Sequence, residues 1–374
     1  MKDKKKSCLQ RLMIGNKNTR LAFISLTLIV LFITVSLAAE SPDVSEYRYH
    51  ELTIPILTYH KFCSGESPDE YTINIAQFRE HLDYLKNNDY RVISLTRLLE
   101  CIENNFFPEK PVVITIDDGF KSVYSLAFPI LKEYNYPATL YLYTDFVGNN
   151  SNQLTWSEIK EMIAEGIEIG SHSLSHTNLL NMKKGESRSD YLNRINKEIS
   201  LSKTILERNT ASQVLSFAYP YGVYSEDIKV LAKEAGYKAL LNVNSMNNSI
   251  PINAYALNRQ IIGSDCSVAQ FQAILREKTL AVNDIFPPDG IIIDNQSSTV
   301  GAVLNNPANI ELNSLYMRLG GAGLHCTYQP EQNKVSFTPV APKLLQKRTW
   351  IAQITARDSE TGQRRKVAWL FTVR

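Results

Sequence analysis

Two adjacent carboxylates, Asp117 and Asp118, end an unbroken run of strand-forming residues, Val112–Ile116, and are followed by Gly119. The length and β-branched content of that run, with no polar alternation, predict a strand buried on both faces. Burying a charge is unfavourable unless it is paired or bound to a metal, and Gly119 permits a sharp turn and close approach of a ligand. The pair is therefore a candidate for chemistry, although a strand followed by an ordinary Asp-Gly turn gives the same pattern.

A second candidate pair is His172 and His176, which follow the short predicted strand Ile167–Gly170. A spacing of four residues puts two side chains on one side of a helical turn, so both rings can converge on a cation. Histidine is the commonest protein ligand of metals at neutral pH. Two histidines and one carboxylate from another strand would leave coordination positions open for water and substrate, as catalytic metals require. Two surface histidines with other partners are the alternative interpretation.

If a metal binds at the histidines, Asp117 and Asp118 can have different roles. One can bind the ion, while the other stays free as a general base that takes a proton from the attacking water. Adjacent residues on an extended segment point apart, so the two carboxylates need not face the same ion. This combination suits hydrolysis of an unactivated amide or ester.

Tyr221 and His60 are weaker candidates that also follow predicted strands. Tyr221 lies in Phe217–Gly222, where a proline and a glycine shape a tight loop, and its backbone N–H could face an oxyanion. A packing role for this aromatic-proline turn is equally compatible with the sequence. His60 ends the predicted strand Leu52–Tyr59 and can either reach the same edge or be structural. Trp156 can line a sugar groove, with core packing as the alternative.

Predicted strands and helices alternate from residue 52 to residue 243, which favours a parallel α/β sheet or barrel. The number of strands suits a barrel, in which functional groups gather where strands end and loops begin. Thr155, with Glu158 three residues later, predicts a helix start with a capping box. The predicted strands are Leu52–Tyr59, Tyr90–Ser94, Val112–Ile116, Ala138–Tyr143, Ile167–Gly170, Val214–Ala218 and Tyr237–Val243. The predicted helices are Ile75–Asn87, Leu95–Glu103, Ser122–Tyr134, Thr155–Glu165, Tyr191–Arg208 and Glu226–Ala235.

The pattern changes near Pro287-Pro288. Beyond it, short apolar runs separated by turn residues predict a small all-β sandwich, and the end of the chain resembles the last hairpin of bacterial immunoglobulin-like modules. We therefore expect an α/β domain over residues 52–280 and an immunoglobulin-like β-sandwich over residues 288–374. The runs are Gly290–Ile293, Lys334–Pro339, Thr349–Ala356 and Val367–Arg374.

The N-terminal region predicts export. A basic segment, residues 1–20, precedes an uncharged apolar run, residues 21–39, which has the roughly 20 residues needed to cross a bilayer. A transmembrane signal anchor followed by a polar stalk, residues 40–51, is the favoured interpretation. A signal peptide cut near Ala38-Ala39-Glu40 is the alternative. The rest of the chain is then held at the membrane on the extracytoplasmic side (periplasmic or outer), or is secreted if the segment is cleaved.

The composition further narrows the kinds of protein that this chain can be. Hydrophobic residues make up 44% of the chain and charged residues 21%, so most of it can fold around a core. The formal net charge is +2 and much of the excess lies in the N-terminal tail, so we expect no nucleic-acid partner. The five cysteines are scattered without a CxxC pair. This argues against a cysteine-zinc site and leaves room for one or two disulfides.

Three stretches, in this order, resemble the motifs of the polysaccharide deacetylase family, the NodB-homology domains of carbohydrate esterase family 4. They are Thr115-Ile116-Asp117-Asp118-Gly119, His172-Ser173-Leu174-Ser175-His176 and Tyr219-Pro220-Tyr221-Gly222. The resemblance, from about Ile54 to Gly263, implies a distorted (β/α) barrel that removes acetyl groups from N-acetylglucosamine units. It also implies a divalent metal, zinc first with cobalt or nickel as alternatives, on Asp118, His172 and His176, and Asp117 as the base. Tyr59-His60 and Phe217–Gly222 resemble the subgroup that deacetylates poly-N-acetylglucosamine exopolysaccharides.

The chain departs from this family in three places. It has no Asp-rich fourth motif that ends in tryptophan. Ala218 stands where the third motif usually has arginine, and Leu257-Asn258-Arg259 stands where a late Leu-x-His is usual. That histidine is commonly the general acid, so the resemblance does not assign a proton donor here. We expect Arg259 to supply the missing guanidinium and to orient Asp117.

The sequence thus predicts a membrane-anchored, metal-dependent polysaccharide N-deacetylase that acts on an N-acetylglucosamine polymer, with an exopolysaccharide as the first choice. One alternative keeps the enzyme but changes its substrate to peptidoglycan or another acylated carbohydrate. Another is a non-catalytic glycan-binding or assembly protein that keeps the fold.

Overall fold

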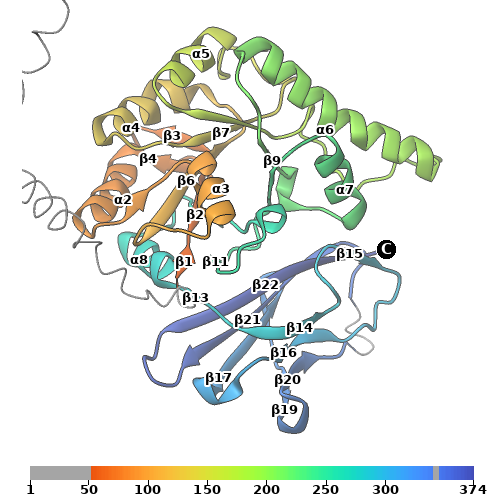
Figure 1. The fold of residues 1–374 in the computed structure, drawn as a ribbon. Helices are drawn as coiled ribbons and strands as arrows, with labels where there is room; N and C mark the ends of the chain where they lie inside the picture. Colours follow the sequence, from red (N-terminus) through yellow and green to blue (C-terminus); the bar gives the residue numbers. More distant parts are fainter. Residues whose placement is uncertain (1–51, 340–344) are drawn as a thin grey trace, which may run out of the picture. The chain divides into compact units, whose positions relative to one another are not determined.

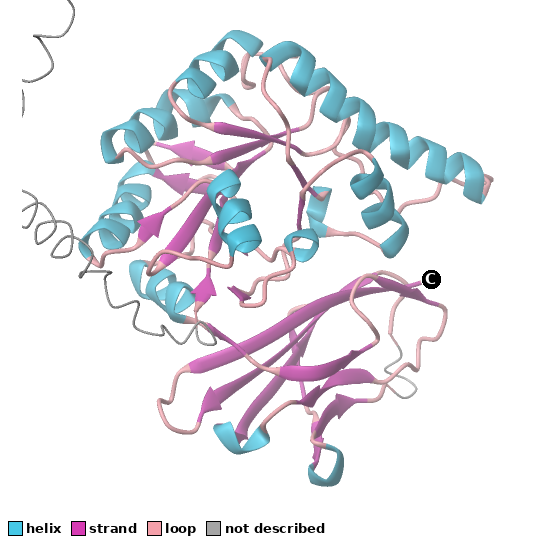
Figure 2. Ribbon diagram, viewed as in Figure 1, coloured by secondary structure: helices cyan, strands magenta, loops and turns pink. Residues whose placement is uncertain are grey.

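Eight parallel strands form the curled sheet on which the candidate site is built (Figure 1, Figure 2). The structure is a computed structural model that describes residues 52–339 and 345–374. The strand order is β10-β9-β8-β7-β6-β2-β12, and β5 pairs with the start of β6. The bounds are β2 (Ile56–Tyr59), β5 (Arg91–Val92), β6 (Pro111–Asp117), β7 (Thr139–Leu142), β8 (Glu168–Ser171), β9 (Ser216–Ala218), β10 (Ala239–Leu241) and β12 (Gln260–Ile261).

A short segment, Leu257–Ile261, joins the two ends of this sheet. Leu257 bridges to Leu241 at the end of β10, and β12 pairs in parallel with Leu57 and Thr58 of β2. The curled parallel sheet therefore fits the predicted distorted barrel. Because all of its strands run the same way, their carboxyl ends meet at one edge.

Seven α-helices in the described part of the chain accompany this sheet, and the apolar faces of six of them share one core with it. Buried residues such as Leu82, Ile159 and Ile195 belong to the same hydrophobic cluster as Ile114 in the middle of β6. All seven residues of β6 are buried, as its sequence predicts. The helices are α2 (Ile75–Asn87), α3 (Leu95–Asn104), α4 (Phe128–Tyr134), α5 (Trp156–Ala164), α6 (Arg188–Thr210), α7 (Glu226–Glu234) and α8 (Val268–Arg276).

Two local predictions about helix starts can be compared with the structure. The capping box is confirmed: Glu158 N donates to Thr155 Oγ1 (3.4 Å) and Thr155 N donates to Glu158 Oε2 (3.0 Å). The predicted helix Ser122–Tyr134 is instead a π-helical turn, Val123–Ala127, that leads into α4. Pro129 lies in the first turn of α4, where the missing N–H of proline costs no helical hydrogen bond.

The C-terminal part, which we call the β-domain (residues 278–374), contains two sheets. One has the order β13-β22-β21-β17-β18 with β15 beside β22, and the other has the order β14-β16-β20-β19. Its core contains Val300, Met317, Trp369 and Phe371. The strands are β13 (Lys278–Thr279), β14 (Val282–Phe286), β15 (Ile291–Ile293), β16 (Val300–Leu304), β17 (Ile310–Leu319), β18 (Ala322–Leu324), β19 (Thr327–Gln329), β20 (Lys334–Phe337), β21 (Thr349–Asp358) and β22 (Arg364–Val373).

The β-domain is all-β, and β21 and β22 form the antiparallel hairpin expected at the end of the chain. Strand pairing already begins at Lys278, before the predicted start at residue 288. The immunoglobulin-like assignment and the domain boundaries stay predictions. Two small pairings complete the fold: β1 (Thr53–Ile54) with β11 (Asn248–Ser249), and β3 (Lys61–Cys63) with β4 (Thr72–Asn74).

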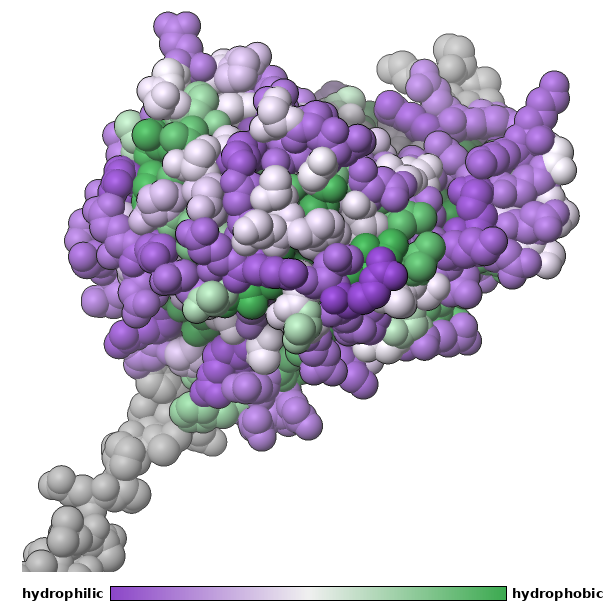
Figure 3. Space-filling model, turned by 90° about the horizontal axis from the view of Figure 1, so that it is seen from above, coloured by the Kyte–Doolittle hydropathy of each residue, from purple (hydrophilic) through white to green (hydrophobic). Residues whose placement is uncertain are grey.

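The predicted membrane anchor, residues 21–39, lies outside the described residues, as do the basic segment and the stalk. Within residues 52–339 and 345–374, no helix is both long enough and apolar enough to cross a membrane. Figure 3 shows one face of this part, on which hydrophilic side chains predominate and hydrophobic ones form small separate groups. Cys63, Cys101, Cys266 and Cys326 are free thiols.

One buried histidine links β2, α2 and α8. His81 is fully buried, stacks on Phe271 with ring centroids 4.1 Å apart, and contacts the Tyr59 hydroxyl (3.3 Å) and the Cys266 carbonyl (3.0 Å). Burial lowers the pKa of His81 to about 4. The pKa of His81 is therefore 6.5 in the unfolded chain and about 4 in the folded chain. At a pH between these two values, His81 binds a proton in the unfolded chain but not in the folded chain.

Folding stability should consequently fall as the pH drops through this window. We expect His81 to account for a loss of at most about 3 kcal/mol in the free energy of unfolding between pH 6.5 and pH 4. Urea unfolding of the wild type and of His81→Gln, both with chelator, would test this. The variant should start less stable but lose less stability over the window. Equal losses in the two proteins would contradict the assignment.

Candidate metal centre and active site

Functional side chains collect at the carboxyl edge of the barrel, as expected for parallel strands. Asp117 ends β6, and His60, His172 and Tyr219 directly follow β2, β8 and β9. They border a pocket of about 430 Å³ that contains every predicted site residue. Its lining is His60, Lys61, Tyr71, Asp117, Asp118, Phe120, His172, His176, Tyr219, Tyr221, Gly222, Val243, Arg259 and Ile261.

Asp118, His172 and His176 form a group that could hold a metal ion. Their ligand atoms all lie within 4.8 Å of one another. Asp118 Oδ1 is 3.4 Å from His176 Nε2 and 3.8 Å from His172 Nε2. This oxygen is buried and has no hydrogen-bond partner in the described part of the chain. Burial, and next the charge of Asp117, raise the pKa of Asp118 to about 7. A cation at this place would relieve both effects, so the residues fit a divalent metal.

His172 is held in the form that a metal requires. Its Nδ1–H donates to the Ala218 carbonyl oxygen at 2.7 Å, because a carbonyl can only accept. The lone pair is therefore on Nε2, the nitrogen that faces Asp118. Burial lowers the pKa of His172 to about 3, which keeps the ring neutral at physiological pH.

The predicted helical turn between His172 and His176 is wrong. The segment is an irregular loop in which Ser173 (φ 72°) and His176 (φ 57°) take left-handed conformations. The buried carboxylate of Glu198, on α6, accepts from Leu174 N (3.2 Å), Ser175 N (3.0 Å) and Ser175 Oγ (2.8 Å). These bonds replace the helical hydrogen bonds that the loop lacks. The rings nevertheless converge, with centroids 4.8 Å apart.

Asp117 is held by Arg259 rather than by the metal group. Arg259 Nη1 donates to Asp117 Oδ1 (2.7 Å) and Nη2 to Oδ2 (2.8 Å), a two-pronged ion pair between buried side chains. Burial by itself would raise the pKa of Asp117. The charges of Arg259 and His172 and the Arg259 hydrogen bonds outweigh burial and hold that pKa at about 2. Asp117 is therefore ionised beside the metal group. Arg259 contacts Asp117 directly, and its role in orienting a base stays a prediction.

His60 and Tyr221 both line the pocket. His60 Nδ1 is buried without a hydrogen-bond partner among the described residues, and burial lowers the pKa of its ring. Tyr221 is 61% exposed, and its ring lies edge-on to His176 at 4.7 Å. The turn's own hydrogen bonds run from Gly222 N and Val223 N, so they do not use the Tyr221 N–H. A side chain at Gly222 would meet Val243 Cγ2 at 2.1 Å, so this turn requires glycine.

Comparison with known proteins identifies this arrangement. The family profile described as polysaccharide deacetylase matches residues 104–240. The poly-β-1,6-N-acetyl-D-glucosamine N-deacetylase of Staphylococcus aureus is 27% identical over 245 residues, which cover 61% of this chain and 84% of that protein. Residues 104–240 therefore form a polysaccharide deacetylase domain.

Solved structures of family members agree with this assignment. The Streptococcus pyogenes deacetylase PplD, in complex with acetate, superposes with a TM-score of 0.55 at 25% identity, covering 60% of this chain and 99% of PplD. IcaB from Ammonifex degensii shares the fold, with a TM-score of 0.52 at 23% identity, covering 60% of this chain and 97% of IcaB. The family profile ends at residue 240, so the segment that carries Arg259 lies beyond it.

Several residues of this deacetylase pocket were not predicted from the sequence. Lys61, Tyr71, Phe120 and Tyr219 line it, and only Tyr219 stood within a recognised motif. Trp156, considered for the sugar groove, instead packs against the hydrophobic core. Lys61 follows His60 and is the second residue after β2, so its position close to a strand end was the available signal.

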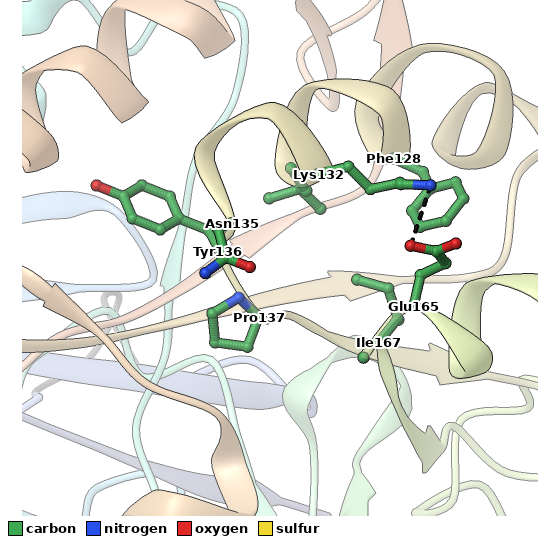
Figure 4. A pocket seen from close by; sticks show the side chains of 9 residues that line it. Phe128, Lys132, Asn135, Tyr136, Pro137, Glu165 and Ile167 are labelled. Atoms are coloured by element: carbon green, nitrogen blue, oxygen red, sulfur yellow. Dashed lines mark ion pairs between the residues drawn. The ribbon is translucent and has the colours of Figure 1, made fainter.

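A second pocket has different chemistry. It lies between the end of α4, the segment Asn135–Pro137 that enters β7, and Ile167 at the start of β8 (Figure 4). Lys132 Nζ and Glu165 Oε2 form an ion pair 3.0 Å long across it. It is therefore at the amino ends of these strands, and its charged side chains neutralise each other. We assign it no catalytic role.

Glu198 should control metal affinity although it does not touch the metal group, because it fixes the loop between the two histidines. We expect Glu198→Gln to weaken zinc binding about 10-fold to 100-fold, the usual effect of removing an outer-shell partner. Glu207→Gln, the same change on the same helix, is the matched control. Glu207 accepts from Val214 N and does not contact the loop. Zinc titrations with equal affinities for the two variants would contradict the assignment.

Proposed function

We propose that this protein is a metal-dependent hydrolase that removes N-acetyl groups from an N-acetylglucosamine polymer and releases acetate and a free amine. The observation that supports this most directly is the pairing of an ionised base, Asp117, with a three-ligand metal group one residue away. Arg259 keeps Asp117 ionised beside that group, as a base that takes a proton from the attacking water must be. The polysaccharide deacetylase domain and the name of the Staphylococcus aureus relative support the reaction class and the poly-β-1,6-linked substrate.

Asp118, His172 and His176 would hold the metal. Two imidazoles and one carboxylate suit zinc, with cobalt and nickel as alternatives. When bound, such an ion polarises the acetamide carbonyl and makes the attacking water more acidic. Three protein ligands leave coordination positions for water and substrate, as the proposed hydrolysis needs.

The remaining groups handle protons and charge. Asp117 takes the proton of the attacking water, and Arg259 keeps the base ionised and oriented. The Tyr221 N–H faces the developing oxyanion. We assign proton delivery to the leaving nitrogen to His60, because it lines the pocket and its Nδ1 has no hydrogen-bond partner among the described residues. Burial lowers the pKa of its ring, so His60 is neutral at rest and would first have to take up the proton that it delivers. The Tyr219 hydroxyl also has no hydrogen-bond partner among the described residues, but burial raises its pKa well above the ordinary value.

Three further features belong to this proposal. We infer that residues 21–39 anchor the chain in the cell membrane with the barrel on the extracytoplasmic side, where an exopolysaccharide is accessible. We retain the immunoglobulin-like sandwich as the assignment for the β-domain. Peptidoglycan is the alternative substrate, and a comparison of the two glycans in one assay distinguishes them.

The base can be tested by Asp117→Asn, which keeps the shape of the side chain but cannot take a proton. We expect acetate release from β-1,6-linked N-acetylglucosamine oligomers by the zinc-loaded full-length protein to fall about 10²-fold to 10⁴-fold. Zinc content should be unchanged. Wild-type protein that binds the oligomers but releases no acetate would establish the non-catalytic alternative instead.

The role of Arg259 predicts a change in pH dependence. In the wild type Asp117 is deprotonated well below neutral pH, because its pKa is about 2. In Arg259→Met the burial of Asp117 is no longer offset, so its pKa rises and the acid limb of kcat/KM moves to higher pH. We expect about a 100-fold loss at pH 7 and a larger loss at pH 5. Arg259→Lys, which keeps the charge without the two-pronged geometry, should be intermediate. An Arg259→Met profile parallel to that of the wild type would exclude this role.

A further inference from the structure

One acidic residue of the β-domain, Asp289, contacts the barrel close to the active site. Asp289 lies in the turn between β14 and β15, and its Oδ1 accepts from Leu370 N in β22 (3.0 Å). Its Oδ2 accepts from the hydroxyl of Tyr224 (2.5 Å), a fully buried residue between β9 and α7 of the barrel. Asp289 is thus fixed by the backbone of its own domain while it binds a side chain of the other.

Tyr224 in turn contacts a buried loop of the barrel. Asn244 Nδ2 donates to the Tyr224 hydroxyl oxygen (3.4 Å), and Asn244 N donates to Asn242 Oδ1 (2.9 Å). Both asparagines are at most 2% exposed, so water does not replace these contacts. The Tyr224 ring also stacks on the ring of Tyr219 at 5.0 Å, and Tyr219 lines the pocket.

The same loop holds Arg259 from two sides. Arg259 Nε donates to the Asn242 carbonyl oxygen (3.1 Å), and Ser245 N donates to the Arg259 carbonyl oxygen (3.2 Å). The two remaining guanidinium nitrogens bind Asp117. An unbroken series of polar contacts therefore runs from Asp289 through Tyr224, Asn244, Asn242 and Arg259 to Asp117.

We propose that Asp289 is a positioning residue for the active site, and that the β-domain acts through it to orient Arg259 and so Asp117. This inference rests on the proposed deacetylase function for its kinetic consequence, but the physical coupling does not depend on it. The loop 242–245 has no regular secondary structure, so its position depends on such side-chain contacts. A guanidinium that must meet both carboxylate oxygens tolerates little displacement, and small errors in position are costly to catalysis.

Two mild substitutions and a matched control test this in the full-length, zinc-loaded protein. Asp289→Asn keeps the volume of the side chain but has one acceptor oxygen for two donors. Tyr224→Phe removes only the bridging hydroxyl and keeps the ring stack. Asp358→Asn makes the same chemical change at a buried carboxylate of the β-domain that contacts Thr361 and Arg365, away from the series.

We expect each of the first two variants to lower kcat for acetate release about tenfold with KM within about twofold of the wild type, a coupling of ordinary size. The double variant should lose no more than either single variant, because both act through one contact. Asp358→Asn should lose stability but keep kcat. A kcat for Asp289→Asn and Tyr224→Phe equal to that of the wild type, or losses that multiply in the double variant, would overturn the inference.

Hydrogen exchange separates this inference from the proposed function. The amides of Asn244 and Ser245 should exchange faster in Asp289→Asn and Tyr224→Phe but not in Asp358→Asn. If the wild type releases no acetate and the exchange effect is present, the coupling stands and only the deacetylase proposal fails. If acetate is released and neither kcat nor exchange responds, the inference about Asp289 fails alone.

Discussion

The buried ion pair between Arg259 and Asp117 is the interaction on which the site depends. Two neighbouring carboxylates share one pocket, and an isolated buried carboxylate tends to bind a proton. Arg259 prevents this at Asp117 and leaves Asp118 to the opposite outcome, so their pKa values diverge to about 2 and about 7. Asp117 and Asp118 therefore differ in protonation because their surroundings differ, although they are the same residue type and adjacent in sequence.

The metal group depends on a different set of supports. The Ala218 carbonyl fixes the tautomer of His172, and Glu198 fixes the loop that carries His176. Neither support touches the base, and Arg259 touches no ligand of the metal group. The hydrogen-bonding supports of the metal group and of Asp117 are therefore separate, so substitutions in the two sets can be distinguished by experiment. The two groups still influence each other through charge, since Asp117 raises the pKa of Asp118 and His172 lowers the pKa of Asp117.

Much of this site could be predicted from the sequence, because its strongest signals are local. The run before Asp117 is apolar enough to require a buried strand, and Thr155 with Glu158 contains both halves of a helix cap. The four-residue spacing of the histidines correctly suggested convergence but wrongly suggested a helical turn. Glu198, which decides that loop, is 23 positions from Ser175 in the chain.

The parts that could not be derived are contacts between distant segments. Arg259 is 142 positions from Asp117, and its place was anticipated only as a substitute for an arginine absent at Ala218. Local sequence gives no indication that Asn242 and Asn244 are buried, since asparagine is usually exposed. Their environment arises from the packing of the β-domain and the barrel, which no residue pattern within either part encodes.

The position of Arg259 in the chain also determines when, during synthesis, Asp117 can form its ion pair. It directly precedes β12, the last strand to join the parallel sheet, and β12 pairs with β2 near the start of the described chain. A nascent chain that has emerged only through β10 already contains both carboxylates and both histidines, but Asp117 still lacks its partner. Asp117, the proposed base, therefore gains its partner only when the barrel closes, and a chain shortened before Arg259 would carry the metal group without the ion pair.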